Sequence, residues 1–206
     1  MQKPKVISAR LAVKIFRTFP AILLASLVGP IFSSFSLAAS FIPDGRATSK
    51  PYGHVAFCKA NPKDCRAVQS AKVSTIKPEV LSAGRFADLK KINTKVNTQI
   101  KPVSDQQSAG VADVWSASVK SGDCEDYALS KRNRLLNAGF NPANLRLAMA
   151  RIPSGIAHLV LVVRTNKGDL VLDNLKNDIK VWNQTGYRFV KIQMSGGSRE
   201  WLAIGN

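Results

Sequence analysis

The order of sequence patterns predicts an α+β fold in which N-terminal helices pack on an antiparallel sheet. Apolar residues recur at helical spacing over about 79–100 and again from Cys124 towards Gly139. After Gly139 the pattern changes to short apolar runs separated by turn residues, which indicates consecutive strands. With 206 residues, of which 45% are hydrophobic, the chain can bury one ordinary core. We therefore expect one domain with extensions.

The N-terminus has the features of an export signal. Basic residues without any acids precede an apolar run over about 19–32, and Ser36–Ala38 offers small residues at both positions that a signal peptidase reads. Two prolines and a glycine within the apolar run argue against a lasting transmembrane helix. We therefore expect a cleavable signal peptide over 1–38, an extended arm over 39–57 and the folded domain over 58–206. An uncleaved anchor is the alternative.

The chain is strongly basic, with a formal net charge of +17. The first 38 residues hold five of the 30 lysines and arginines and no acids, which leaves +12 on the rest. Such a surface suits nucleic acid, anionic lipid or an acidic protein. No zinc-binding spacing, RNA-binding signature or Walker loop accompanies the charge. We interpret it as a solvated face and expect no nucleic-acid partner.

The cysteine count predicts one disulfide and one free thiol, because exported proteins meet an oxidising compartment. Cys58 and Cys65 lie seven residues apart and flank Asn61-Pro62, a turn signal that brings them together. Pairing these two leaves Cys124 over. A leftover thiol in an exported protein is a candidate nucleophile. The alternatives are an inert buried cysteine or a disulfide to another chain.

Cys124 lies at the predicted start of a helix. Asp123 is a favourable N-cap residue, Glu125 and Asp126 are acids in the first turn, and Gly139 ends the pattern as the C′ residue. The unpaired N–H groups of a helix start favour a thiolate. Three neighbouring carboxylates have the opposite effect, since they raise the pKa of a thiol. The site therefore needs a cationic partner or a bound cation.

Between these features lies an amphipathic helix, expected over about 79–100. One apolar stripe marks its buried face, namely Leu89, Ile92, Val96 and Ile100. Asn93 and Asn97 lie one turn apart on this helix, and we expect them to cap neighbouring loops rather than face a cleft. The stretch 101–121 reads as a loop. We expect Trp115 to be its anchor in the core rather than a cleft residue.

The strands are expected over 145–150, 157–163, 169–175, 180–182 and 187–194. The second of these is almost continuously apolar, as in a strand buried on both faces. His158 interrupts it, and Asp173 interrupts the next strand in the same way. The turn signal Asn166-Lys167-Gly168 joins the two strands.

The hairpin register decides whether these two polar residues meet. A four-residue loop with Val163 opposite Gly168 places His158 opposite Asp173, and a two-residue loop at 165–166 gives the same pairing. Their Cβ atoms would then lie about 5 Å apart. A three-residue loop would need a bulge to restore the pairing.

A buried imidazole needs a partner for its ring N–H. His158 and Asp173 therefore form either a satisfied polar pair in the core or a base with its orienting acid. Together with Cys124 they supply a nucleophile, a base and an orienting acid. The second histidine, His54, lies in the arm near Cys58, where we expect a structural role.

Three segments resemble the bacterial transglutaminase-like cysteine proteinases: Gly122–Tyr127, His158–Leu161 and Gly168–Leu175. The resemblance extends from about Tyr52 to Trp201. Well-known members are periplasmic proteases of the LapG type, which cut large surface adhesins and release biofilm cells. The segments Gly53–Cys58 and Asp64-Cys65 are most similar to the alphaproteobacterial branch, whose substrates are less clear.

The resemblance implies a papain-like, transglutaminase-like fold and a role for each polar residue. Cys124 would be the nucleophile, His158 the general base and Asp173 its orienting partner. Members of the LapG type also bind calcium through acids around the cysteine, which makes Asp123, Glu125 and Asp126 candidate ligands. A capped helix start explains the same three acids equally well. The backbone N–H of Cys124 is one expected oxyanion donor, and the sequence identifies no second one.

The expected function is that of an exported, periplasmic cysteine endopeptidase acting on a cell-envelope or surface-adhesin protein. Expected partners are this protein substrate and a membrane-associated regulator, and we expect a monomer. A transglutaminase or amidase acting on envelope proteins would use the same three residues. From another class, a non-catalytic periplasmic binding module would keep them without turnover.

Overall fold

The computed structural model describes residues 39–65, 76–108, 110, 113–196 and 199–205. Contacts divide the chain into two units, Met1–Ser36 and Leu37–Asn206, and the fold is that of the second unit. The predicted signal peptide over 1–38 lies outside the described residues. Of the helices in the described ranges, none has the length and apolar character needed to span a membrane.

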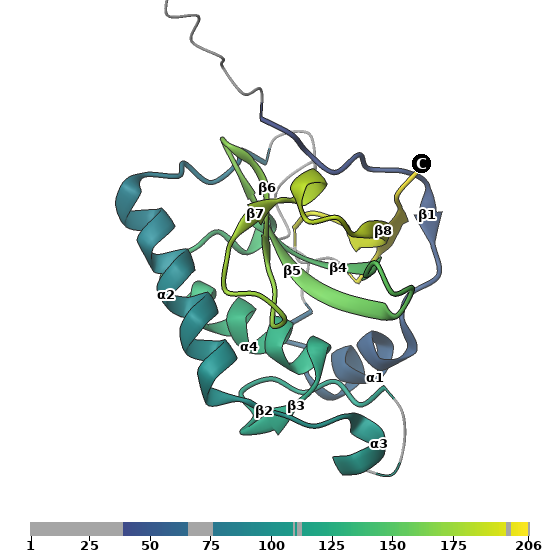
Figure 1. Cartoon of the computed structure of the whole chain (residues 1–206). Coiled ribbons are helices and arrows are strands. Elements are labelled where there is room, and N and C mark those ends of the chain that lie inside the picture. Colours follow the sequence, from purple (N-terminus) through teal and green to yellow (C-terminus); the bar gives the residue numbers. More distant parts are fainter. Residues whose placement is uncertain (1–38, 66–75, 109, 111–112, 197–198, 206) are drawn as a thin grey trace, which may run out of the picture. The chain divides into compact units, whose positions relative to one another are not determined.

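An antiparallel sheet organises the described part of the chain (Figure 1). Its strand order is β1-β9-β8-β4-β5-β6-β7, and every pair of neighbours is antiparallel. The strands are β1 (Ala47–Thr48), β4 (Leu145–Arg151), β5 (Ala157–Thr165), β6 (Gly168–Leu172), β7 (Lys180–Val181), β8 (Arg188–Gln193) and β9 (Trp201–Ala203). The predicted sheet is therefore confirmed, with the two short strands β1 and β9 added to it.

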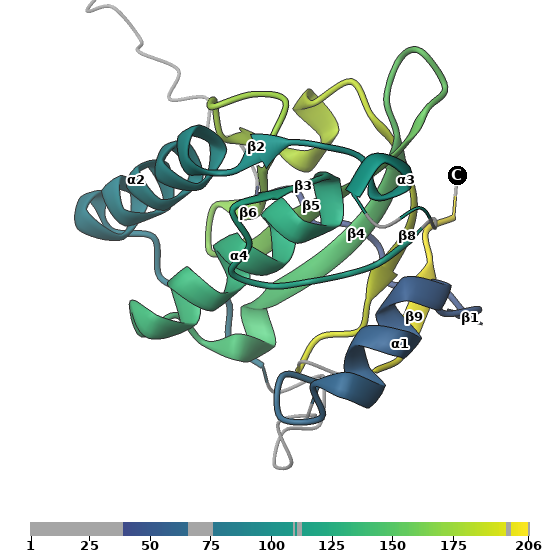
Figure 2. The same ribbon diagram turned by 90° about the horizontal axis from the view of Figure 1, so that it is seen from below.

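Helices α1 (Tyr52–Ala60), α2 (Ala83–Gln99) and α4 (Cys124–Asn137) contribute to the core on one face of this sheet. The chain also forms α3 (Asp105–Ser108) and the short 3₁₀ helices η2 (Pro142–Asn144) and η3 (Trp182–Gln184), and Trp182 packs against the core on the opposite face. A small parallel pair, β2 (Lys101–Pro102) and β3 (Ser121–Gly122), lies in the segment expected to be a loop. Figures 1 and 2 show α4 lying across β5 with α2 beside it. The predicted α+β class is confirmed.

The sheet has a core on each face. Leu159, Leu161 and Val163 of β5 pack in the core that α4 covers, with Leu129 and Leu135 of that helix. Val160 and Val162 pack in the second core. Both faces of β5 are therefore buried, which explains why its sequence is continuously apolar rather than alternating.

The arm predicted over 39–57 is extended only as far as Pro51, because α1 begins at Tyr52. Before that, Ser40 forms a bridge to Gly168, and Ile42 is buried in the second core. The folded domain thus begins well before the predicted boundary at residue 58. The spacing of the buried residues could have predicted this helix, because they form two pairs one helical turn apart: Gly53 and His54, then Phe57 and Cys58.

A residue far away in the sequence, Trp115, packs against α1 at Gly53. A Cβ atom on Gly53 would lie 2.3 Å from Trp115 Cδ1, so only glycine allows this approach. Trp115 is buried and stacks edge-on against Trp201, which confirms its predicted role as a core anchor. The contact spans some sixty positions of sequence, and it could not be read from the arm itself.

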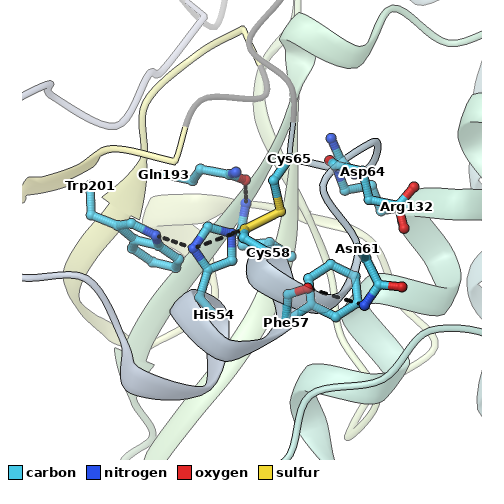
Figure 3. Close-up of a disulfide and its surroundings, with 10 residues drawn as sticks. His54, Phe57, Cys58, Asn61, Asp64, Cys65, Arg132, Gln193 and Trp201 are labelled. Atoms are coloured by element: carbon cyan, nitrogen blue, oxygen red, sulfur yellow. Dashed lines mark hydrogen bonds between the residues drawn. A yellow bond between two sulfur atoms is a disulfide. The ribbon is translucent and has the colours of Figure 1, made fainter.

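The predicted disulfide between Cys58 and Cys65 is present, with the Cα atoms 5.5 Å apart. Figure 3 shows His54 between Trp201 and this disulfide. Trp201 Nε1 donates to His54 Nδ1 at 3.1 Å, and His54 Nε2 lies 3.5 Å from Cys58 Sγ. Burial, aided by nearby cations, lowers the pKa of His54 to about 4. A neutral, buried His54 fits the structural role expected of it.

The start of α2 differs from the prediction, whereas α4 begins where it was predicted to begin. Ser82 caps α2 by accepting from Arg85 N, and Glu79 lies outside the helix, in a bridge to Thr165. At α4, Asp123 occupies the N-cap position but its side chain makes no capping hydrogen bond. The C-terminal end of α4 is as predicted: Gly139 N donates to Leu136 O and Phe140 N to Leu135 O, a Schellman arrangement.

The β5–β6 register differs from the prediction by two residues. Thr165 lies opposite Gly168 and Leu161 opposite Leu172, so the loop is residues 166–167. Asp173 therefore follows the end of β6 and is not directly opposite His158. A shift of two residues keeps both side chains on the same face, because side-chain direction alternates with period two.

Candidate active site

Cys124 is the first residue of α4, and hydrogen bonds from a neighbouring segment hold this helix start. Lys101 N donates to Lys120 O at 2.9 Å, Val103 N to Gly122 O at 3.0 Å, and Asp105 N to Asp123 Oδ2 at 3.2 Å. The segment 101–105 therefore runs alongside the residues that lead into α4. This alignment brings α3 next to the cysteine.

Gly122 makes the entry into α4 possible. A Cβ atom at this position would lie 2.0 Å from Asp126 Oδ2, so any other residue would push the Asp126 carboxylate away. That carboxylate also accepts from Ser116 N at 2.8 Å. The Gly-Asp-Cys-Glu-Asp order is thus a packing requirement as well as a chemical one.

The thiol of Cys124 is the one free thiol among the described residues. Burial raises its pKa well above the ordinary value, and the charge and hydrogen bonding of Glu125 add to this effect. The thiol donates to Glu125 Oε2 at 3.1 Å. A hydrogen bond from the backbone N–H of Leu159 acts the other way and lowers the pKa. As a nucleophile, Cys124 therefore needs a base.

His158 precedes Leu159 in β5, and the backbone N–H of Leu159 is hydrogen-bonded to the Cys124 sulfur, so the backbone of β5 next to His158 lies beside the thiol. His158 Nε2 lies 2.8 Å from Asp173 Oδ1, and both residues are buried. With Nε2–H donated to the carboxylate, Nδ1 is the unprotonated nitrogen of the neutral ring. That nitrogen is the one available to take a proton.

Asp173 is saturated with hydrogen bonds. Besides His158, Leu175 N donates to Oδ1 at 3.0 Å and the Tyr187 hydroxyl donates to Oδ2 at 2.5 Å. Burial alone would raise the pKa of this carboxyl, but the hydrogen bonds from His158, Tyr187 and Leu175 outweigh it and lower the pKa. Asp173 is therefore a fixed anion beside the imidazole.

The loop after β6 is held by the two asparagines of α2. Asn97 Nδ2 donates to Asp173 O at 2.8 Å and to Asn177 Oδ1 at 2.9 Å. Asn93 Nδ2 donates to Asn177 O at 3.1 Å. The predicted capping role is confirmed for both, and Asn97 in addition fixes the backbone of Asp173.

A cleft of about 420 Å³ opens at the cysteine. Its lining comes from the segment leading into α3, from the start of α4, from the start of β5 and from the loop after β6: Pro102, Val103, Ser104, Gln107, Gly122, Asp123, Cys124, Ala157 and Asn174. The amide side chains of Gln107 and Asn174 bring hydrogen-bonding groups to this cleft. Cys124 therefore lies in the wall of an open cleft.

Acidic side chains gather beside the same helix start. One carboxylate oxygen from each of Asp105, Asp123 and Glu125 lies within 4.8 Å of the others. Asp123 Oδ1 is buried without a hydrogen-bond partner, and burial raises the pKa of Glu125 to about 8. Oxygen ligands at this spacing suit a hard cation such as calcium.

Two of the three predicted metal ligands, Asp123 and Glu125, belong to this group. Asp126 lies apart from it, bonded to Ser116 N, and burial raises its pKa to about 6. Sequence reasoning missed Asp105, which lies eighteen positions before Asp123 and reaches the site only through the pairing of 101–105 with 120–123. Tyr187 was missed for a similar reason, since a tyrosine at the start of a strand carries no local functional signal.

A helix-start cysteine, a histidine–aspartate pair on an adjoining antiparallel sheet and an open cleft are the parts that a cysteine peptidase needs. Residues 44–206 match the model of the bacterial transglutaminase-like cysteine proteinases (BTLCP). The chain belongs to this family, as its resemblance predicted.

Solved structures of Legionella pneumophila LapG are similar to this chain. One is 26% identical, with a TM-score of 0.46, and the match covers 52% of this chain and 63% of that chain, which is less than two thirds of its length. A calcium-bound structure is also 26% identical, with a TM-score of 0.49, covering 59% of this chain and 71% of that chain. An EGTA-treated structure has a TM-score of 0.46, 26% identity and coverages of 52% and 62%. No curated protein sequence matches the chain.

Proposed function

We propose that this peptidase is an exported endopeptidase that cuts a protein of the cell envelope, with a surface adhesin as the candidate substrate. Cys124 is its nucleophile, His158 the general base and Asp173 the orienting acid. The observation that carries this proposal is the 2.8 Å bond between His158 Nε2 and Asp173 Oδ1, beside the contact of Leu159 N–H with the Cys124 sulfur. Together they leave His158 Nδ1 as the proton acceptor for the thiol.

The reaction follows from these positions. His158 Nδ1 takes the thiol proton that Glu125 otherwise shares, and the sulfur attacks the peptide carbonyl carbon. The C–N bond breaks, the amine leaves with the proton from His158, and the acyl group stays on the sulfur as a thioester. Water then attacks the thioester while His158 accepts its proton, the C–S bond breaks, and the proton returns to sulfur. A carboxylic acid is released.

The negative oxygen of each tetrahedral intermediate needs N–H donors. The backbone N–H of Cys124 lies in the first turn of α4, where N–H groups have no partner within the helix. A second donor comes from a cleft side chain, and the Gln107 amide is our candidate. The fixed Asp173 anion stabilises the imidazolium that forms when His158 takes up the proton.

The carboxylates at the start of α4 form a candidate binding site for a hard cation. Asp105, Asp123 and Glu125 would hold it, and we keep Asp126, the predicted ligand outside their group, as a candidate that binding data must decide. Calcium takes six to eight oxygen ligands in flexible geometry, which suits such a cluster. Its charge would offset the carboxylates that hold the proton on Cys124.

We place the mature enzyme in the periplasm as a monomer, with a membrane-associated regulator as a candidate partner. The basic, apolar and small-residue order of the first 38 residues supports export. The disulfide between Cys58 and Cys65 supports it independently, because disulfides persist in oxidising compartments.

Comparative proteomics of released surface proteins tests the proposed function. Cells with the native protein should shed fragments of a surface protein that cells with Cys124→Ser or His158→Ala retain. A purified native enzyme should then cut the identified protein at the same bond. Equal shedding in all three strains contradicts the proposal. Incorporation of a fluorescent amine into envelope protein, without cleavage, would instead identify a transglutaminase.

A further inference from the structure

The Asp173 carboxylate has a second partner, Tyr187, that the three-residue mechanism does not use. The Tyr187 hydroxyl donates to Asp173 Oδ2 at 2.5 Å, on the opposite carboxylate oxygen from His158. The Tyr187 ring also stands edge-on to the His158 ring, with centroids 5.9 Å apart and planes at 90°. One side chain thus touches both the base and its acid.

Three strands of the sheet bring Tyr187 to this position. Ala150 of β4 pairs with His158 of β5 on one side and with Phe189 of β8 on the other. His158 and Phe189 therefore lie in one row across the sheet and share a face. Tyr187 precedes Phe189 by two residues, so its side chain lies on the same face, immediately before the start of β8.

A turn after η3 fixes the backbone of Tyr187. The hydroxyl of Thr185 donates to Trp182 O at 2.8 Å, and it accepts from Tyr187 N at 3.2 Å. Tyr187 is partly buried, and a cavity of only about 10 Å³ lies beside Tyr187 and Asp173. That volume leaves room for about one water molecule. The tyrosine is therefore held in place before any substrate arrives.

We propose that Tyr187 is a positioning residue of the proposed triad: its hydroxyl fixes the Asp173 carboxylate, and its ring fixes the plane of His158. The inference rests on the proposed function and deepens it. With Oδ2 bonded to Tyr187, only Oδ1 faces the imidazole. With the ring edge against His158, the imidazole keeps Nε2 on Asp173 and Nδ1 free.

The direction of the hydroxyl hydrogen bond is fixed near neutral pH. Burial raises the pKa of Tyr187, and the hydrogen bond and charge of Asp173 raise it further, so the hydroxyl stays protonated and donates. A donor on Oδ2 withdraws negative charge from the carboxylate. The imidazolium of His158 is then stabilised less than it would be by an unshared carboxylate.

Other charged groups surround the pair, and a test has to hold them constant. Lys131 approaches from α4, and the charge of Asp173 raises its pKa, although burial lowers that pKa overall to about 7. Lys176, Asp178 and Lys180 line the small cavity beside Asp173 with Tyr187. The Cys124 thiol and Glu125 lie at the start of α4. Substitution of Tyr187 changes none of these residues.

Two variants separate the two roles of Tyr187. Tyr187→Phe removes the hydroxyl and keeps the ring, whereas Tyr187→Leu removes both. Tyr127→Phe is the matched control, because it also removes a hydrogen-bonding tyrosine hydroxyl: the buried Tyr127 hydroxyl donates to Ile100 O at 2.6 Å and not to the pair. The readout is the NMR titration of histidine side chains in the mature protein at a fixed calcium concentration. The chain has only two histidines, and a His54→Gln variant assigns them.

In Tyr187→Phe the carboxylate regains its full charge, so the His158 pKa should rise by about half a unit, a threefold gain in proton affinity. The Nε2–H tautomer should persist in this variant. In Tyr187→Leu, ¹⁵N shifts should show a mixture of both tautomers. An unchanged or lowered His158 pKa in Tyr187→Phe overturns the hydroxyl role. A single Nε2–H tautomer in Tyr187→Leu overturns the ring role.

An Asp173→Asn variant in the same experiment distinguishes failure of this inference from failure of the triad. Loss of the carboxylate should lower the His158 pKa, because the imidazolium loses its anion. If Asp173→Asn leaves the His158 titration unchanged, the triad itself is wrong. If Asp173→Asn lowers the pKa and Tyr187→Phe does not raise it, the triad stands and the role of Tyr187 is wrong.

Discussion

The two halves of the active site differ in how completely their charges are satisfied. In the sheet half, formed by His158, Asp173 and Tyr187, both carboxylate oxygens of Asp173 accept hydrogen bonds, and the pKa of Asp173 is lowered despite burial. In the helix half, formed by Asp105, Asp123, Cys124 and Glu125, the pKa values of the thiol and of Glu125 are raised. Among the described residues, Asp123 Oδ1 has no hydrogen-bond partner. The charges of the sheet half are therefore balanced by its own residues, whereas an added positive charge would stabilise the helix half.

The first prediction tests the sheet half, where we expect the largest effect. Asp173→Asn keeps the shape of the side chain but removes the anion that orients His158 and stabilises its imidazolium. In a serine-protease triad the equivalent change costs about 10⁴ in rate, and we expect a similar loss here. The melting temperature should change little compared with the rate. Turnover close to that of the native enzyme would show that Asp173 does not belong to the catalytic group.

The second prediction tests the helix half through the pH dependence of stability. The pKa values of Glu125 and Asp126 are raised from 4.5 to about 8 and from 3.8 to about 6. Between the unfolded-state and folded-state pKa values of these two carboxyl groups, the folded protein binds more protons than the unfolded protein does. The free energy of unfolding must therefore fall as pH rises through this window, in the absence of a cation.

Calcium should reverse this loss, and more so at pH 8 than at pH 5, because it binds ionised carboxylates. At a concentration about 100 times the dissociation constant it would add about 2.7 kcal/mol, which raises the melting temperature by about 5–10 °C in a domain of this size. Differential scanning fluorimetry with calcium, magnesium and a chelator measures the effect. Asp123→Asn is the matched variant and should abolish the shift. A shift of equal size at both pH values would contradict ligation by Glu125.

The third prediction compares two asparagines that hold the same loop. Asn97 donates to the carbonyl of Asp173, whereas Asn93 donates to that of Asn177. Each substitution by alanine should lower stability by about 1 kcal/mol, the net value of one hydrogen bond. Only Asn97→Ala should also lower turnover, because only it releases the backbone of the orienting acid. Equal turnover in the two variants would show that the loop holds Asp173 without Asn97.

In both halves of the active site, some residues could be predicted from the sequence and others could not. Local signals predicted the helix around Cys124, its end at Gly139, the pairing of Cys58 with Cys65, the strand that contains His158 and the strand that Asp173 follows. Period-two alternation kept His158 and Asp173 on one face, although the register was wrong by two residues. Asp105 and Tyr187 were not predictable, because each reaches the site through strand or segment pairing that no local pattern encodes.

A thiol-labelling experiment tests most directly whether His158 is the base for Cys124. Mature native protein, His158→Ala and Asp173→Asn are treated with iodoacetamide at pH 7 without reductant, and the labelled residue and its rate are followed by mass spectrometry. The account predicts labelling of Cys124 alone, since Cys58 and Cys65 are paired, and a large fall in rate in His158→Ala. Equal rates in native protein and His158→Ala would contradict the proposed triad, as would labelling at Cys58 or Cys65 with Cys124 untouched.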